Sequence, residues 1–178
     1  SKDWGGKVFT DLVKGQEYII ENYDFIDDDK IAAAGASFGG YMMNWFEGHM
    51  DAFEYPFKTL INHDGAFNLY SKYLTTEELW FPEWEFDGPF WKNEKYYKKY
   101  SPHNYIENFN TPMLIIHGEK DYRLDFGEGL QPFTALRRKG IEAKLVLFPD
   151  EGHWVQEPKN SRFWHNTIFD FLDKYIGK

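Results

Sequence analysis

The sequence predicts an α/β fold with a mainly parallel sheet flanked by helices, because four short apolar segments alternate with segments of helical periodicity. The 178 residues are enough for one domain with a core of its own. Hydrophobic residues make up 42% of the chain and aromatic residues alone 20%, which is too much apolar surface for a disordered segment. We therefore expect a folded globule.

The first two elements follow from periodicity and length. Between Phe9 and Tyr23, apolar residues recur near i, i+3, i+4 spacing, which predicts a helix that ends before the three aspartates at 27–29. Residues 30–35 are short, apolar and followed by a glycine-rich turn, so they are predicted to form a buried strand. A helix is expected directly after that turn, over residues 39–47.

Three more strands and two more helices are expected in the remainder. The predicted strands cover residues 57–62, 112–118 and 142–148, and the predicted helices cover 128–139 and 161–175. Residues 69–110 are crowded with Trp, Tyr, Phe, Pro and Gly and have no clear period. We expect an irregular excursion with short helices there, of the kind that often covers a binding site.

The composition excludes several classes of function. With 20 Lys and Arg against 29 Asp and Glu, the formal charge is −9, which disfavours a surface that binds nucleic acid. No apolar stretch approaches the roughly 20 residues of a membrane helix, so we expect no membrane partner. The chain has no cysteine, which rules out disulfides, thiolate zinc sites and a cysteine nucleophile.

The pattern Gly-x-Ser-x-Gly at residues 35–39 is the most specific signal in the sequence. It lies between a predicted strand and a predicted helix, where the chain must turn sharply and Ser37 must take a strained backbone conformation. Glycines two residues to either side leave room for that turn. The pattern predicts a nucleophilic serine; the alternative is a glycine-rich strand–helix turn without catalysis.

An activated serine needs a base, and the base needs an acid that orients it. Asp121 follows the third predicted strand and His153 follows the fourth, so all three side chains lie at the carboxyl ends of strands, where open α/β sheets place their sites. The chain order Ser, Asp, His is the order expected for an α/β-hydrolase.

Other residues could fill these roles. His63 and His117 also sit at strand ends and are alternatives for the base, while Asp125 and Asp150 are alternatives for the acid. The backbone N–H of Phe38, directly after the nucleophile, is expected to donate to the oxyanion. The second donor normally comes from a loop after an earlier strand, and we expect no such strand before the first one here.

Four segments resemble the catalytic domain of the prolyl oligopeptidase family of serine peptidases: Trp4-Gly-Gly6, Gly35-Ala-Ser-Phe-Gly-Gly-Tyr-Met42, His117-Gly-Glu-Lys-Asp-Tyr-Arg123 and Gly152-His153. The likeness runs from about residue 3 to residue 175. It implies an α/β-hydrolase domain of eight strands, of which residues 1–178 would be the C-terminal portion with the final four strands. The N-terminal strands and a β-propeller would lie upstream of this chain.

The resemblance also implies roles for single residues. Ser37 would be the nucleophile, Asp121 the orienting acid and His153 the general base. Arg123 would bind a substrate carbonyl, or else be an ordinary surface arginine. Two further aromatic residues, Phe67 and Tyr70, would join Phe38 at the specificity pocket, or else be ordinary core residues. The sequence has Asp125 where the family often has proline, which adds a negative charge near the arginine.

The activity implied is hydrolysis of peptide bonds near the N-terminus of short peptides through an acyl-enzyme, with no metal or organic cofactor. Within the family, the likeness is greatest to secreted fungal dipeptidyl peptidases, which implies an extracellular location. An acylaminoacyl-peptidase or a carboxylesterase would use the same triad. A different alternative is that the isolated chain is a catalytically incomplete fragment, because its sheet would have an open edge.

Overall fold

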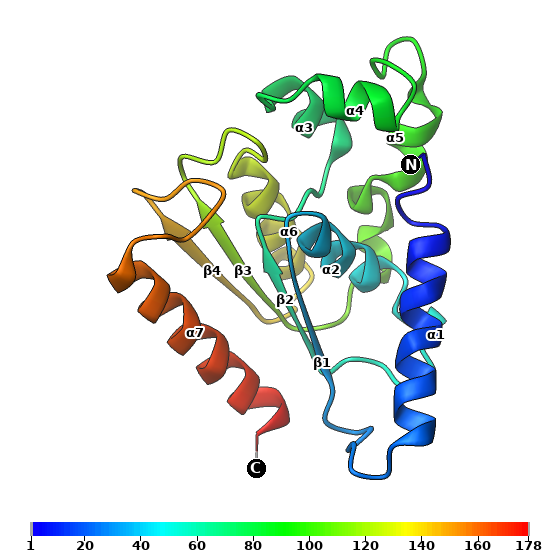
Figure 1. Cartoon of the computed structure of the whole chain (residues 1–178), viewed down its shortest axis with the longest axis vertical. Helices are drawn as coiled ribbons and strands as arrows, with labels where there is room; N and C mark the ends of the chain where they lie inside the picture. The colour runs from blue at the N-terminus through cyan, green and yellow to red at the C-terminus, as the bar shows by residue number, and fades with distance from the viewer. Residues whose placement is uncertain (1, 178) are drawn as a thin grey trace.

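The computed structural model describes residues 2–177, which form a four-stranded parallel sheet with helices on both faces (Figure 1). The strands lie side by side in chain order, and every neighbouring pair is parallel. The predicted α/β class and parallel sheet are therefore confirmed. The strands are β1 (Ala32–Ala36), β2 (Thr59–His63), β3 (Met113–Gly118) and β4 (Ala143–Phe148).

The four long helices agree with the helical periodicity. They are α1 (Lys7–Asn22), α2 (Phe38–Gly48), α6 (Gly127–Arg138) and α7 (Pro158–Ile176). Helix α7 begins three residues before its predicted start, because a proline is well suited to the first turn of a helix. Helix α6 is followed by Gly140 at φ +77°, a conformation that glycine adopts without strain.

The excursion between β2 and β3 consists of short helices, as predicted (Figure 1). They are α3 (Leu69–Thr75), α4 (Trp80–Glu85), α5 (Glu94–Tyr100) and the 3-10 segment η2 (Pro102–Asn108); a further 3-10 turn, η1 (Met50–Ala52), follows α2. Trp4, in the N-terminal segment, packs edge-on against Tyr41 of α2 and Phe86 after α4. The excursion and the N-terminal segment therefore lie together above the carboxyl end of the sheet.

Two hydrophobic clusters cover the two faces of the sheet. The larger cluster joins α2, α6 and the excursion to one face, and the smaller cluster joins α7 to the other face (Figure 1). In the smaller cluster, Phe171 of α7 packs with Ile61 of β2 and Leu114 of β3. Strands β2 and β3 are buried along their whole length because both faces are covered.

The prediction that the first strand is buried was wrong. Strand β1 lies at the edge of the sheet, and Ala34 and Ala36 are exposed. Its side chains are small and apolar, so the sequence pattern is that of a buried strand although no further strand pairs with it among residues 2–177. The other edge strand, β4, carries the exposed charge of Lys144.

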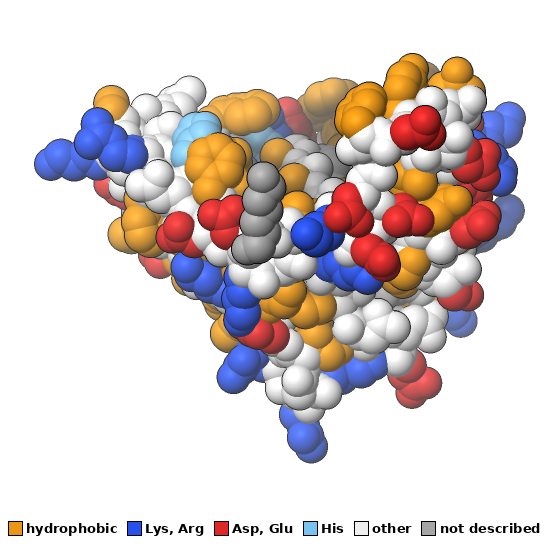
Figure 2. All heavy atoms as spheres, turned by 90° about the horizontal axis from the view of Figure 1, so that it is seen from below, with side chains coloured by type: hydrophobic (Ala, Val, Ile, Leu, Met, Phe, Trp, Pro, Cys, Tyr) orange, Lys and Arg blue, Asp and Glu red, His pale blue; other side chains and the backbone are white. Residues whose placement is uncertain are grey.

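Side chains of several kinds share the surface seen in Figure 2, where acidic and basic groups are interspersed with hydrophobic ones. No helix within the described part of the chain is both long and apolar enough to span a membrane.

The first turn of α2 packs directly on the end of β2. A Cβ atom at Gly40 would lie 2.5 Å from the carbonyl oxygen of His63, and the Cα of Gly65 is almost as close. Buried amides reinforce this contact, because Asn62 donates to Asn44 at 2.9 Å and accepts the N–H of Gly65 at 3.0 Å. The backbones meet here because glycines leave room for them.

Replacing Gly40 with alanine tests this contact. The new methyl group would press on backbone atoms, so we expect the free energy of unfolding to fall by about 2–3 kcal/mol. Gly39→Ala is the matched control. Gly39 is the preceding residue of the same helix, it has open space around its Cβ position, and alanine favours a helix. Urea unfolding measures both variants, and an equal loss in the two would contradict the proposed contact.

Candidate active site

Three side chains from the carboxyl edge of the sheet form a continuous hydrogen-bonded line. Nε2 of His153 lies 3.0 Å from Oγ of Ser37, and Nδ1 of the same ring lies 2.6 Å from Oδ2 of Asp121. The serine follows β1, the aspartate follows β3 and the histidine follows β4. This is the arrangement of a nucleophile, a general base and an acid that orients the base.

Ser37 sits in the strained turn that the sequence predicts. Its backbone has φ +58° and ψ −116°, and its N–H donates to the carbonyl oxygen of His63 at 2.9 Å. A side chain at Gly35 would overlap the backbone of Gly39, so the first glycine of the pattern is required. The expectation that the turn also needs a glycine at position 39 is wrong, because a Cβ atom there would meet open space. The second position at which a side chain would collide with backbone atoms is Gly40.

Asp121 is held by its own loop. It is 2% exposed, and its Oδ1 accepts the N–H groups of Arg123 and Leu124, each at 2.9 Å. Burial alone would raise the pKa of Asp121, but the hydrogen bonds from His153 and Leu124 outweigh burial and lower that pKa below its ordinary value. The carboxylate is therefore ionised at neutral pH and accepts from the imidazole.

A second carboxylate shapes the loop that carries His153. Glu151 is buried and accepts the backbone N–H groups of Gln156 and Glu157, each at 3.0 Å, and the side chain of Asn160 at 2.8 Å. These bonds close the loop around the imidazole, whose side chain is only 8% exposed. The imidazole of His153 is therefore held by its loop on one side and by Asp121 on the other.

The side chains of the alternative residues, although some lie close by, are not part of this hydrogen-bonded line. His117 is fully buried and its Nε2 lies 2.7 Å from the carbonyl oxygen of Leu124, as for a donated N–H. Asp125 accepts the N–H of Gly127 and Asp150 accepts from Asn160. None of these groups is hydrogen-bonded to Ser37 or His153 among residues 2–177.

The backbone N–H of Phe38 is free to serve an oxyanion. Phe38 is the first residue of α2, and an N–H at that position has no acceptor within its own helix. No strand precedes β1 among residues 2–177, so the described chain lacks the loop expected to supply a second donor.

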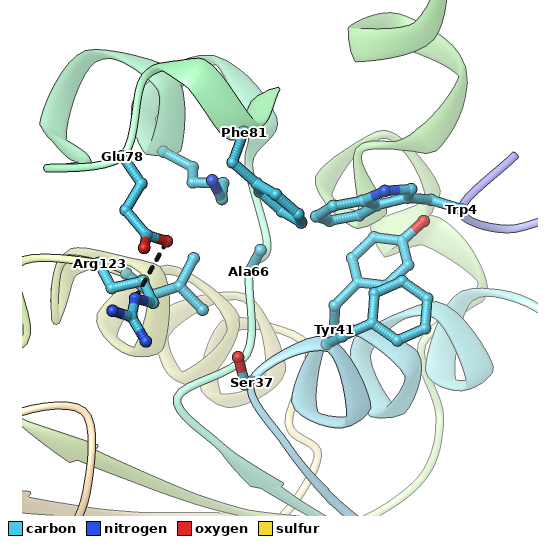
Figure 3. A pocket seen from close by; sticks show the side chains of 10 residues that line it. Trp4, Ser37, Tyr41, Ala66, Glu78, Phe81 and Arg123 are labelled. Atoms are coloured by element: carbon cyan, nitrogen blue, oxygen red, sulfur yellow. Dashed lines mark ion pairs between the residues drawn. The ribbon is translucent and has the colours of Figure 1, made fainter. Parts of the chain in front are cut away.

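A cavity of about 200 Å³ opens beside Ser37 (Figure 3). Aromatic rings from the N-terminal segment, α2 and α4 form one side of it, and three charged side chains from the excursion and the Asp121 loop lie on the other. The lining residues are Trp4, Ser37, Phe38, Tyr41, Ala66, Lys72, Glu78, Phe81, Arg123 and Leu124. A mostly apolar cavity with a few polar groups suits a side chain or a peptide segment of a substrate.

The three residues predicted to bind substrate differ in position. Arg123 lines the cavity, and its Nε lies 3.1 Å from Oε2 of Glu78 (Figure 3). Phe67 and Tyr70 do not line it. Phe67 is 2% exposed in the main core, and the hydroxyl of Tyr70 donates to Glu94 at 3.0 Å. Both rings pack within the excursion, whose path periodicity could not predict.

Lys72 is a charged residue of the cavity that the sequence analysis missed. It is 3% exposed, no carboxylate oxygen lies within ion-pair distance of it among residues 2–177, and its ammonium lies 5.5 Å from the ring centre of Phe81. Burial lowers the pKa of Lys72 to about 8. Its position in α3 gave no signal, because a lysine in a short helix is ordinarily exposed.

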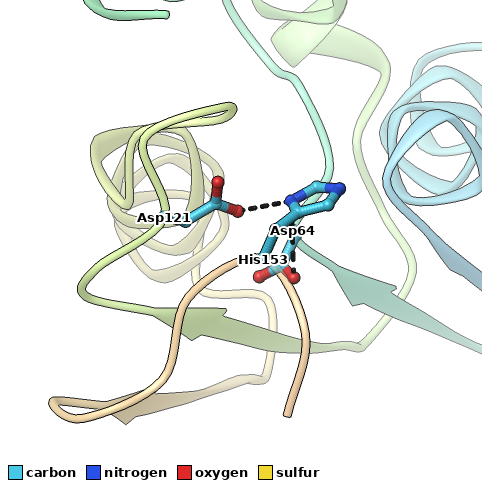
Figure 4. Close-up of side chains that lie close together, drawn as sticks. All are labelled: Asp64, Asp121 and His153. Atoms are coloured by element: carbon cyan, nitrogen blue, oxygen red, sulfur yellow. Dashed lines mark hydrogen bonds and ion pairs between the residues drawn. The ribbon is translucent and has the colours of Figure 1, made fainter. Parts of the chain in front are cut away.

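Asp64 was missed as well. It follows β2, and its Oδ2 lies 3.9 Å from Nδ1 of His153 (Figure 4). Ligand atoms of Asp64, Asp121 and His153 lie within 4.8 Å of one another, close enough to hold a cation. A metal ion on Nδ1 of His153 would displace its hydrogen bond to Asp121, so the arrangement fits proton transfer better than metal binding. The position of Asp64 directly after β2, at the edge where open α/β sheets place their sites, could have identified it from the sequence.

Comparison with known proteins agrees with this geometry. Residues 1–178 match the sequence profile of the prolyl oligopeptidase family. The chain is 48% identical to dipeptidyl-peptidase 5 of Aspergillus oryzae, over 98% of the chain and 24% of that protein. It is 42% identical to dipeptidyl-peptidase 5 of Schizosaccharomyces pombe, over 97% of the chain and 25% of that protein.

Solved structures give the same result for the fold. The acylaminoacyl peptidase of Pyrococcus horikoshii superposes with a TM-score of 0.88 at 27% identity, over 98% of this chain and 28% of that one. The chain therefore spans about a quarter of the length of the relatives it matches.

Replacing Asp121 with asparagine tests the orienting role. The amide cannot hold the imidazole in the tautomer that accepts the serine proton, so we expect the rate of Ser37 modification by a fluorophosphonate to fall at least about a hundredfold. Asp125→Asn is the control, because that carboxylate lies four residues further on and, among residues 2–177, accepts only the N–H of Gly127. Mass spectrometry over time gives both rates, and equal rates would exclude Asp121 as the acid.

Replacing Lys72 with methionine tests whether its charge destabilises the fold. Because the pKa is about 8 when folded and 10.5 ordinarily, the variant should be more stable, on the order of 3 kcal/mol, below pH 8. The gain should vanish as the pH rises from 8 towards 10.5, where the unfolded lysine is also neutral. Urea unfolding at several pH values measures the free energy of unfolding of this variant and of a control, Lys92→Met, which replaces an exposed lysine. A gain in stability that does not depend on pH would show that the charge of Lys72 is not its cause.

Proposed function

The chain belongs to the prolyl oligopeptidase family, and on that premise we propose that it is the C-terminal portion of a serine peptidase catalytic domain that releases dipeptides from peptide N-termini. The observation that carries the proposal is the line of hydrogen bonds from Ser37 through His153 to Asp121. The sequence identity to dipeptidyl-peptidase 5 proteins supports the proposal that cleavage takes place near the N-terminus of the substrate.

The proposed reaction uses each member of the line in turn. Ser37 Oγ attacks the scissile carbonyl carbon while its proton passes to Nε2 of His153. Asp121 holds the ring by its Nδ1–H and stabilises the imidazolium. The N–H of Phe38 donates to the oxyanion. His153 then gives the proton to the leaving amine, and water hydrolyses the acyl-enzyme on Ser37.

The cavity beside Ser37 is the proposed site for the residue whose carbonyl is attacked. Trp4 and Phe81 offer apolar walls, and Arg123 lies where it can donate to a peptide carbonyl, with Glu78 holding its guanidinium. Lys72 offers a further donor inside the same cavity. A peptide is therefore the proposed substrate.

We propose that further strands of the same sheet and a β-propeller precede this chain in the intact enzyme. The chain spans about a quarter of its curated relatives. The open edge at β1 and an apolar groove of about 480 Å³ between α1, β1 and α2, with Leu12, Ala33 and Met43 among its residues, support this. An extracellular location is proposed from the resemblance to secreted peptidases.

A second candidate is an acylaminoacyl-peptidase, which the TM-score of 0.88 to the Pyrococcus horikoshii enzyme favours. Both activities use the same triad, as a carboxylesterase would, and they differ in whether the substrate has a free or an acylated N-terminus. A third candidate is that residues 1–178 alone are incomplete, because the second oxyanion donor would come from the upstream strands.

The test compares three chromogenic substrates: a dipeptidyl amide, an N-acylated amino acid amide and a short-chain ester. It uses the chain joined to its proposed upstream part, with Ser37→Ala as the control. We expect kcat/KM for the dipeptidyl amide to exceed that for the acylated amide at least about tenfold, because a dipeptidyl peptidase has to bind the free N-terminal ammonium group, which the acylated amide lacks. The reverse preference would establish the second candidate, and turnover in the control would exclude Ser37.

A further inference from the structure

The carboxylate of Asp64 is buried beside the triad without a hydrogen bond. The residue is 1% exposed, and neither of its oxygens has a hydrogen-bond partner among residues 2–177. A buried charge is unfavourable unless neighbouring groups compensate it. The surroundings of Asp64 must therefore explain why an acidic residue stands there.

Three imidazole rings surround this carboxylate. Oδ2 of Asp64 lies 2.9 Å from Nε2 of His63 and 3.9 Å from Nδ1 of His153, and Oδ1 lies 3.8 Å from Nε2 of His117. His117 already faces the carbonyl oxygen of Leu124 with that nitrogen. The rings that face the Asp64 carboxylate with a nitrogen not taken up by a backbone carbonyl are therefore those of His63 and His153.

The other charged group at this point is Asp121. Its Oδ2 lies 2.6 Å from Nδ1 of His153 and 3.6 Å from Nε2 of His117. The ring of His153 thus has a carboxylate in hydrogen-bonding contact and a second carboxylate about one ångström further from the same nitrogen (Figure 4). Both carboxylates are almost completely withdrawn from water, which strengthens their effect on the ring.

The backbone directs Asp64 into this position. Its φ is +49°, in the left-handed region that aspartate and asparagine tolerate better than most residues. Its N–H donates to the carbonyl oxygen of Ile116 at 2.9 Å, which ties the residue to β3. The next residue, Gly65, is fixed by its close contact with Gly40. The carboxylate is therefore placed by the sheet and not by a mobile loop.

We propose that Asp64 is a second carboxylate for the catalytic histidine, a positioning residue that acts through His153. The step rests on the proposed peptidase function: a bond forms from Ser37 Oγ to the carbonyl carbon, the proton passes to Nε2, and the carbonyl electron pair moves to oxygen. The imidazolium then faces both carboxylates. At 3.9 Å against 2.6 Å, Asp64 supplies about two-thirds of the attraction of Asp121 at equal dielectric, and it takes no proton itself.

The first test reads the histidines directly and needs no turnover. ¹H–¹⁵N NMR of the ring nitrogens is followed against pH in the unaltered chain and in Asp64→Asn, which keeps the left-handed backbone. We expect His153 to lose its proton at a pH lower by about one unit in the variant, because the imidazolium loses one of two carboxylates. Asp150→Asn, which changes an exposed carboxylate after β4, should leave the titration of His153 unchanged.

Two results would overturn the proposal. If the titration of His63 moves and that of His153 does not, Asp64 is only the partner of His63. If neither moves, the carboxylate is structural. Asp64→Gly serves if the asparagine variant does not fold, since glycine adopts the same φ without strain. Because the readout is the ring itself, failure of the peptidase proposal leaves this test intact.

The second test measures the rate at which a fluorophosphonate modifies Ser37 between pH 5 and 9. In Asp64→Asn we expect the acid limb of the profile to move to lower pH by the same amount as the His153 titration, and the maximal rate to fall about tenfold. A lower rate with an unmoved limb would contradict the proposal, because lost stability alone does not change the pH at which the base becomes neutral.

Discussion

The close approach of α2 to the end of β2 is the contact on which the site depends. Gly40 and Gly65 let the two backbones touch, and the N–H of Ser37 bonds the carbonyl oxygen of His63 across the same junction. The helix must therefore start at the edge of the sheet, with Ser37 in the sharp turn that precedes it. Because the sheet is parallel, the ends of β3 and β4 bring Asp121 and His153 to that same edge.

The site concentrates unfavourable features that the rest of the fold has to support. Ser37 and Asp64 have left-handed backbones, the carboxylate of Asp64 is buried without a hydrogen bond among residues 2–177, and Lys72 is a buried lysine. The support comes from β2 and β3, which are buried along their full length between two hydrophobic clusters. Strain and buried charge at a rigid sheet edge are typical of sites that are organised before substrate arrives.

The sequence was sufficient for features that depend on local patterns. The four strands and the long helices follow from periodicity. Strand-end position and the pattern around Ser37 single out the three side chains that the structure brings into one hydrogen-bonded line. The burial of β1 could not be predicted, because small apolar residues suit a covered strand and an edge strand equally. Nor could Phe67 be assigned to the core, or Lys72 to the cavity. The segment between β2 and β3 that holds both has no clear period, and its packing is decided by contacts distant in sequence.

The hydrogen bonds from Ser37 through His153 to Asp121 should leave Ser37 activated in residues 1–178 by themselves. Intact mass after incubation with a serine-directed fluorophosphonate tests it most directly, beside a Ser37→Ala control and with circular dichroism to verify folding. We expect a single adduct on the unaltered chain and none on the control. A folded sample that takes up no adduct, or a control that is labelled equally, would contradict it.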